Sequence, residues 1–339
     1  PAPSVDTLLS CIKKAQQINS SYVLKTTQDA SIDENLNQLL NLAAQKNELI
    51  IDIVGQAVQH TTLKLLKNEG TPKRKYYNHY KLLGGKTWLD GSPQGKTAWL
   101  TKPYYEVPEG ESKDYCGYAT QEDKDVIEYF KSLIENNIQV NVHCNGDAAS
   151  DQFIRCYKKA LEMTDNKTDL RPVMVHAQTV REDQLDDMKE VGIIPTFFLD
   201  HIWFWGDYHY ESVFGAERAN RISPAKSALR RNINFTLHQD SPVKMPNQIL
   251  AMHNAVNRQT QSGRILGAEQ RLSIMEAIKA LTINAAYQYF EEDEKGSIEE
   301  GKVADFVILD RNPLDVDSSE IKEIKVLETI KEGNTIYKK

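Results

Sequence analysis

Cysteine is scarce in this sequence of 339 residues, and the few that occur form no recognisable motif. The four cysteines, at positions 11, 116, 144 and 156, include no CxxC pair. They are too sparse for a disulfide-stapled scaffold. We therefore expect free thiols in a reducing compartment, which makes the cytoplasm the expected location.

The sequence also lacks a long apolar run and an excess of basic residues. No segment approaches the about 20 apolar residues that a membrane span needs, and the longest candidate, VGIIPTFFL, is interrupted by Pro195. The net charge of −7 argues against bulk nucleic-acid binding, because counterion release requires a basic surface. We therefore expect neither membrane nor nucleic acid as a partner, and a small-molecule substrate is compatible with the composition.

Internal repeats of about 20–50 residues are absent, which disfavours a solenoid, and apolar strands alternate instead with amphipathic helical segments. This βαβ rhythm predicts an α/β fold with a parallel sheet. Seven strands is one fewer than a closed (β/α)8 barrel contains. The expected strands begin near Tyr22, Leu49, Leu82, Ile138, Val173, Ile193 and Ile233, and the main expected helices span 5–18, 32–46, 61–68, 121–136, 148–163, 182–190, 223–232 and 273–289.

The pattern changes near residue 290, where Gly and Asn-Pro turns separate short β-rich segments. Such turns between short strands are typical of antiparallel β structure. We therefore expect residues 1–290 to form the barrel part and residues 291–339 a small C-terminal β appendage.

Metal-competent side chains stand at the carboxyl ends of four expected strands, where parallel α/β enzymes carry their chemistry. IQVNVHCNGD ends in His143 and RPVMVHAQ in His176. Either histidine alone would more often be a core or loop residue. Two at equivalent strand ends favour a metal site, since neutral imidazoles suit Zn, Fe, Ni or Mn.

Lys86 and Asp240 stand at two further strand ends, and each has two interpretations. Lys86 is either an exposed lysine in a Gly-rich turn, which composition alone favours, or a lysine modified to a carbamate that ligates metal. Asp240 precedes Ser241-Pro242 and is a turn former or a ligand that also accepts a proton from water, two roles that are compatible.

Aromatic and polar side chains that could contact a substrate cluster in two segments, one with Trp88 and Asp90 and one with His201, Trp205 and His209. LDHIWFWGDYHYES is rich in Trp and His, which pack in a core or lid as readily as they line a pocket for an apolar or aromatic group. The residues that we assign to substrate binding are Trp88, Asp90, His201, Trp205 and His209.

Eight motifs together resemble the amidohydrolase superfamily, specifically the amidohydrolase-3 branch with its YtcJ-like proteins and N-substituted formamide deformylases. The resemblance implies a TIM-like (β/α)8 barrel, a β-sandwich and one or two divalent cations, with zinc expected. It also implies an enzyme that hydrolyses a C–N bond other than a peptide bond, of amide or formamide type, in a small molecule. The motifs, in chain order, are GGKTWLDGSPQGKTA, VNVHCNGDAA, MVHAQTV, WFWGD, FGAERA, HQDSPV, LTINAA and GSIEEGKVADFVILDRNPL.

The resemblance also assigns roles to individual residues. Lys86 corresponds to the carboxylated bridging ligand, and His143 and His176 correspond to the histidines of strands five and six. Asp240 corresponds to the acid of strand eight, which binds metal and shuttles a proton. The resemblance thus favours the carbamate interpretation of Lys86.

Two departures from the family pattern affect these expectations. The His-x-His pair of strand one is absent from the sequence, so we expect strands two to eight here and strand one upstream of Pro1. The family usually has Gly-Ser before the strand-eight aspartate, whereas HQDSPV places the bulkier His238 near the metal position. A complementing amino-terminal segment or a second copy is a possible partner. The alternative function is an inactive barrel remnant that binds a ligand or partner through Trp203 to Tyr210.

Overall fold

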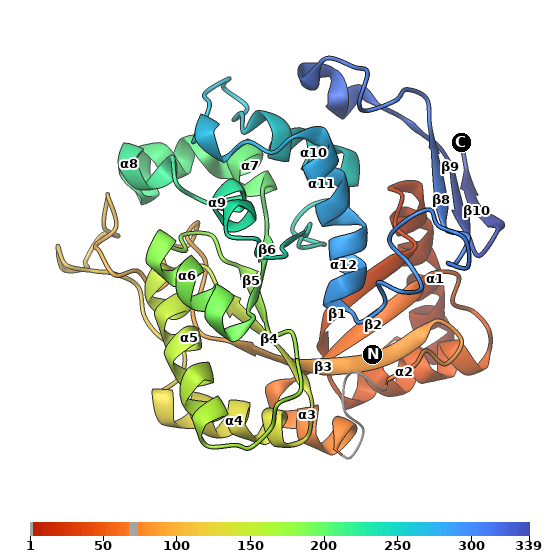
Figure 1. Ribbon diagram of the computed structural model, residues 1–339, viewed down its shortest axis with the longest axis horizontal. Coiled ribbons are helices and arrows are strands. Elements are labelled where there is room, and N and C mark those ends of the chain that lie inside the picture. Colours follow the sequence, from red (N-terminus) through yellow and green to blue (C-terminus); the bar gives the residue numbers. More distant parts are fainter. Residues whose placement is uncertain (1–2, 68–73) are drawn as a thin grey trace.

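A curled parallel β-sheet forms the centre of the molecule (Figure 1). The computed structural model describes residues 3–67 and 74–339, and within these ranges seven strands pair in sequence order from β1 to β7. The predicted α/β barrel class is confirmed, and the described strands form a curled parallel sheet of seven. The strands are β1 (Thr26–Ile32), β2 (Asp52–Val58), β3 (Tyr80–Trp88), β4 (Gln139–Cys144), β5 (Val173–His176), β6 (Ile194–Phe197) and β7 (Thr236–Leu237).

The register of the central strands brings their carboxyl ends to one rim. Trp88 of β3 pairs with His143 of β4, and Cys144 of β4 pairs with His176 of β5. β2 and β5 are buried along their whole length, as expected for parallel strands covered on both faces. Polar side chains at these strand ends therefore meet in one place.

Helices follow most strands and cover the outside of the sheet (Figure 1). Phe130 of α4 packs against Phe153 of α5 in a tilted arrangement, with ring centroids 5.4 Å apart, and both rings are fully buried. This packing fixes the layer outside β3 and β4. The helices are α1 (Val5–Ser21), α2 (Glu34–Gln45), α3 (Gln59–Leu66), α4 (Asp123–Glu135), α5 (Asp147–Glu162), α6 (Glu182–Val191), α7 (Asp200–Tyr208), α8 (Gly215–Ala219), α9 (Ala225–Arg230), α10 (Gln248–Asn257), α11 (Ile274–Leu281) and α12 (Ile283–Gln288).

Three details of the predicted elements are wrong or incomplete. The first strand begins at Thr26 instead of Tyr22, because α1 continues to Ser21 and the chain then turns through Val23 at φ 71°. The helix expected over 273–289 is broken at Thr282, whose φ and ψ of −126° and −93° lie outside the helical region. Helices α7, α8 and α10 are absent from the main expected helices. The expected end of α3 at residue 68 lies outside the described residues.

The predicted C-terminal appendage is a small antiparallel sheet with strand order β10-β9-β8. Its strands are β8 (Phe306–Leu309), β9 (Val326–Lys331) and β10 (Asn334–Lys338), and they lie beside α1 (Figure 1). The hydroxyl of Thr329 donates a hydrogen bond to the carbonyl of Ser20 over 2.8 Å. Lys331 pairs with Asp52 at the start of β2, with an N–O distance of 2.9 Å. The appendage is thus bonded to both α1 and the barrel sheet.

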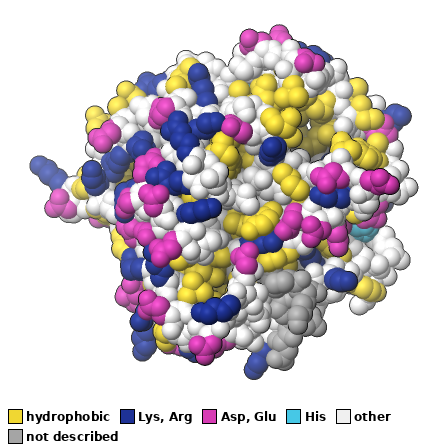
Figure 2. All heavy atoms as spheres, in the orientation of Figure 1, with side chains coloured by type: hydrophobic (Ala, Val, Ile, Leu, Met, Phe, Trp, Pro, Cys, Tyr) yellow, Lys and Arg dark blue, Asp and Glu magenta, His cyan; other side chains and the backbone are white. Residues whose placement is uncertain are grey.

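The surface carries charges of both signs. Figure 2 shows Lys and Arg side chains interspersed with Asp and Glu side chains over one face of the molecule. Among the described residues, no helix combines the length and the apolar character that crossing a bilayer requires.

Candidate metal centre

The structure brings the four predicted ligands to the same rim. Lys86 lies in β3, His143 in β4 and His176 at the end of β5, and Asp240 follows β7 by three residues. The charge of Asp240 acts on Lys86, and His143 and Lys86 both act on His176. The ring of His143 lies 4.6 Å from that of His176, centroid to centroid, and His176 and Asp240 each have a ligand atom within 4.8 Å of the other, so strand ends far apart in the sequence meet here.

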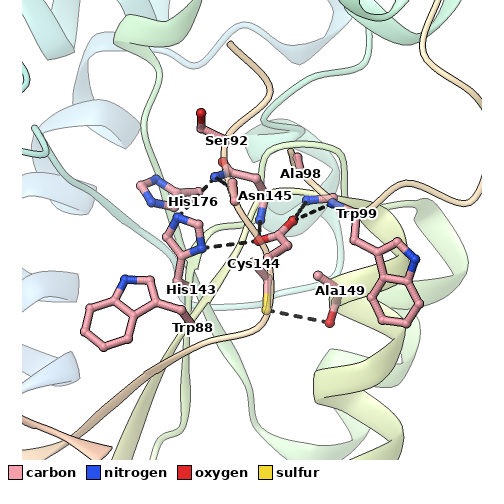
Figure 3. A network of polar contacts seen from close by, with 12 residues as sticks. Trp88, Ser92, Ala98, Trp99, His143, Cys144, Asn145, Ala149 and His176 are labelled. Atoms are coloured by element: carbon pink, nitrogen blue, oxygen red, sulfur yellow. Dashed lines mark hydrogen bonds and ion pairs between the residues drawn. The ribbon is translucent and has the colours of Figure 1, made fainter. Parts of the chain in front are cut away.

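Asp90 holds His143 and the loop that follows it. Its Oδ1 lies 3.2 Å from Nδ1 of His143, and its carboxylate accepts backbone N–H bonds from Trp99, Asn145 and Gly146 over 3.1, 3.0 and 2.7 Å (Figure 3). The Nδ1 contact is an ion-pair distance without hydrogen-bond geometry. A carboxylate only accepts, so it favours the proton on Nδ1 and the lone pair on Nε2, where Nδ2 of Asn145 lies 3.2 Å away. The imidazole is therefore oriented as a ligand would be.

Gly146 allows this loop to close. A Cβ built at this position would lie 1.8 Å from the carbonyl oxygen of Trp99, a distance that real atoms do not reach. Only glycine therefore permits the close backbone approach that brings two N–H groups to Asp90.

His176 and His238 face each other across the rim. Nδ1 of His176 lies 3.1 Å from Nε2 of His238, and the ring of His143 is 4.6 Å from that of His176, centroid to centroid. One ligand atom each from His176, His238 and Asp240 lie within 4.8 Å of one another. The sequence placed His238 near the metal position but did not identify it as a ligand.

Burial keeps these imidazoles neutral. It holds the pKa of His176 well below its usual value, and the neighbouring His143 and His238 lower it further. Burial also lowers the pKa of His238 to about 4. Both rings are uncharged at pH 7, the protonation state in which imidazole binds metal.

Lys86 is buried, with only 3% of its surface exposed, so the interpretation as an exposed surface lysine is wrong. Its Nζ donates to the carbonyl of Thr87 over 3.0 Å and lies 4.2 Å from the ring centroid of Trp88. Burial lowers the pKa of Lys86 to about 7, against the opposing charges of Asp240 and Asp90. The amine is thus partly neutral, and therefore nucleophilic, near physiological pH.

Left-handed backbone marks two of the candidate ligands. His176 has φ 74° and Asp240 has φ 52°. Residues other than glycine adopt this region at an energetic cost, and such strain is concentrated at functional sites. This backbone geometry sets the direction of the His176 and Asp240 side chains at the carboxyl ends of β5 and β7.

The residues predicted to bind substrate lie around this rim in different environments. Trp88 is 37% exposed and lies beside His143 (Figure 3). The ring of His201 lies 6.0 Å from His176, 5.7 Å from Trp205 and 5.9 Å from His209, all between centroids. Asp90 is buried and its carboxylate is engaged by the backbone bonds described above.

His201 and His209 each have a buried ring nitrogen without a hydrogen-bond partner among the described residues. Burial, above all, places the pKa of His201 well below its usual value and that of His209 at about 3. His209 begins a π-helical turn, His209–Val213, an irregularity that is frequent at functional sites. Two neutral imidazoles with free nitrogens thus lie behind the candidate ligands.

The donor set fits a first-row divalent cation. Imidazole nitrogens and a carboxylate oxygen are the ligands that Zn, Fe and Mn accept, and His176, His238 and Asp240 each offer one such atom within one cluster. Fold and site together define an α/β barrel-type protein with a metal-competent rim.

The chain belongs to the amidohydrolase family, whose family model matches residues 12–337. It is 24% identical over 258 residues to YtcJ of Bacillus subtilis (strain 168), covering 75% of this chain and 47% of that protein. It is 28% identical over 207 residues to the N-substituted formamide deformylase of Arthrobacter pascens, covering 60% and 37%. The predicted amidohydrolase-3 branch is confirmed. The chain spans about half the length of these relatives or less.

A solved structure supports the fold in particular. A metal-dependent hydrolase from Pyrococcus horikoshii OT3 matches with a TM-score of 0.79 and 25% identity, over 93% of this chain and 62% of that one.

Proposed function

We propose that this chain contributes the metal-binding rim of an amidohydrolase that cleaves an amide or formamide C–N bond in a small molecule. The proposal rests on the cluster of His176, His238 and Asp240, with His143 4.6 Å from His176 between ring centroids and the buried Lys86 on the neighbouring strand β3. Family membership and the deformylase among the relatives support the type of bond. The free cysteines agree with the expected cytoplasmic setting.

The four side chains would hold a divalent cation, for which zinc is our proposal. When bound, such a cation supplies Lewis acidity toward a carbonyl oxygen and toward water. Lys86 would contribute as a carbamate, formed when its neutral amine attacks CO2 and releases a proton. Asp90 would keep Nε2 of His143 directed to the ion, through the contact at Nδ1.

Asp240 would move the proton during hydrolysis. It is exposed at the rim, where water and substrate have access. As water attacks the carbonyl carbon, the Asp240 carboxylate accepts its proton and then delivers it to the nitrogen that leaves. The C–N bond breaks, and the products are a carboxylic acid, formate for a formamide, and an amine.

Rings beside the cluster would bind the organic part of the substrate. Trp88 and Trp205 offer apolar faces, and His201 and His209 offer neutral hydrogen-bonding nitrogens. A neutral imidazole can recognise an uncharged polar group such as an amide. We propose a neutral substrate with an aromatic or apolar substituent on nitrogen.

The test is metal analysis of the 339-residue chain purified without chelators, with its intact mass. We expect a stoichiometric divalent cation, a mass increase of about 44 Da from CO2 on Lys86, and hydrolysis of N-substituted formamides that Asp240→Asn abolishes. Less than about 0.1 equivalent of metal and no mass shift would overturn the proposal. That result would favour the alternative, a barrel that binds a ligand or partner through residues 203–210.

A further inference from the structure

We propose that His238 is a further ligand of the cation, which sits between His176, His238 and Asp240. The inference rests on the proposed function only in requiring a divalent cation at this rim. His238 does not belong to the ligand set that the family resemblance supplies, and it occupies a position where the family usually has a small residue.

The geometry of the two imidazoles fits a shared ion. Two nitrogens that each lie about 2.0–2.1 Å from one zinc ion at a tetrahedral angle are about 3.3 Å apart. Nδ1 of His176 and Nε2 of His238 are 3.1 Å apart and share a hydrogen bond, whose place the cation would take. One oxygen of the Asp240 carboxylate lies within 4.8 Å of a ring nitrogen of each histidine.

A neighbouring hydroxyl orients His238 for this role. Oγ1 of Thr196 in β6 lies 3.2 Å from Nδ1 of His238 and is buried. When the hydroxyl accepts the Nδ1 proton, the lone pair of His238 is left on Nε2, which faces His176. Ligating histidines generally have such a partner on their second nitrogen.

The backbone and packing hold the ring in place as well. The backbone N–H of His238 donates to the carbonyl of Phe197 over 3.1 Å, which continues the pairing of β7 with β6. The ring of Phe198 lies 5.3 Å from the imidazole, centroid to centroid. His238 is half-buried and Asp240 is exposed, so an ion between them is reachable from solvent.

The ligand chemistry indicates which cations bind. Two imidazole nitrogens and one carboxylate oxygen suit Zn²⁺, Co²⁺, Fe²⁺ and Mn²⁺ and disfavour Ca²⁺ and Mg²⁺, which prefer oxygen ligands. These three ligands would together coordinate the ion at the carboxyl end of β7.

The experiment is calorimetric titration of the metal-free 339-residue chain with Zn²⁺, and with Co²⁺ while its visible absorption is recorded. The variants are His238→Ala and, as a matched control, His60→Ala, which removes an exposed histidine from α3. We expect His238→Ala to weaken Zn²⁺ binding by more than the about 10- to 100-fold that loss of an outer-shell partner costs. The Co²⁺ bands should weaken with it, and His60→Ala should match the wild type.

Wild-type affinity in His238→Ala would overturn the inference and leave the proposed function standing, because Lys86, His143, His176 and Asp240 would then suffice. Failure of the wild type to bind Zn²⁺ would overturn both. If His238→Ala does not fold, Thr196→Val decides. A roughly tenfold loss of affinity with unchanged metal-free melting supports the inference, and unchanged affinity overturns it.

Discussion

Oδ1 of Asp90 lies 3.2 Å from Nδ1 of His143, and the same carboxylate binds the backbone of the two residues after Cys144. A single buried acid from the β3 loop therefore orients a candidate ligand on β4 and closes the loop beyond it. We propose that Asp90 positions His143, because its carboxylate lies against the imidazole and accepts from three backbone N–H groups.

Asp90→Asn should weaken Zn²⁺ binding about 10- to 100-fold. The amide keeps the size of the side chain, but its NH2 group donates and only its oxygen accepts. The amide therefore cannot accept all the backbone N–H groups and still favour the Nδ1 proton of His143. Zinc titration measures the effect, with Asp125→Asn on the exposed face of α4 as the control. An Asp90→Asn variant with wild-type affinity would show that the carboxylate does not orient the ligand.

Trp205→Ala should raise KM for aromatic N-substituted formamides about tenfold and leave kcat nearly unchanged, the signature of lost uniform binding. The ring of Trp205 lies against Phe198 and His201. The matched control is Trp203→Ala, since the ring of Trp203 instead faces His253 and Lys322, away from the rim. Equal effects of the two substitutions would contradict the assignment of Trp205 to substrate binding.

Asp52→Asn should lower the free energy of unfolding at pH 7 by about 3–5 kcal/mol, the cost of removing one partner from a buried ion pair. Asp52 is 3% exposed and pairs with His79, Lys295 and Lys331. Burial would raise the pKa of Asp52, but the His79 hydrogen bond and the two lysine charges outweigh it and hold the pKa well below its usual value.

The lowered pKa of Asp52 makes its contribution to the free energy of unfolding depend on pH. The carboxylate stabilises the fold above its unfolded pKa of about 3.9, and this contribution is lost as the pH falls through the lower, folded value. Urea unfolding at pH 7 and pH 3 should therefore give a smaller difference between Asp52→Asn and wild type at pH 3. Glu135→Gln, in the exposed pair with Lys131, should change little at either pH. A pH-independent difference would contradict the ionic origin.

The order of strands and helices could be predicted from the sequence because strands and helices differ in the pattern of their apolar residues. β3, for example, is continuously buried from Tyr80 to Thr87, whereas α4 has a pronounced apolar face. The break of the last long helix at Thr282 could not be predicted, because the apolar spacing continues through it. The start of β1 was misplaced for a similar reason, since Tyr22 and Val23 have strand-forming side chains but lie in a turn.

The candidate site was predicted as a set of polar side chains at strand ends. This prediction needed only the position of each residue within its strand. Two features needed three-dimensional contacts. Lys86 is chemically an exposed residue type, and only the packing of the strands around it shows the burial. His238 faces His176, 62 positions away, and one clue to this in the sequence was the bulky residue beside Asp240.

The left-handed backbone at His176 and Asp240 limits which residues can replace them. Side chains branched at Cβ, such as valine or isoleucine, clash with their own backbone there, whereas asparagine and glycine adopt this region readily. Substitutions to asparagine would thus separate loss of ligation from loss of shape. The same restriction means that a descendant that abandons metal chemistry would be expected to keep small polar residues or glycine at both strand ends.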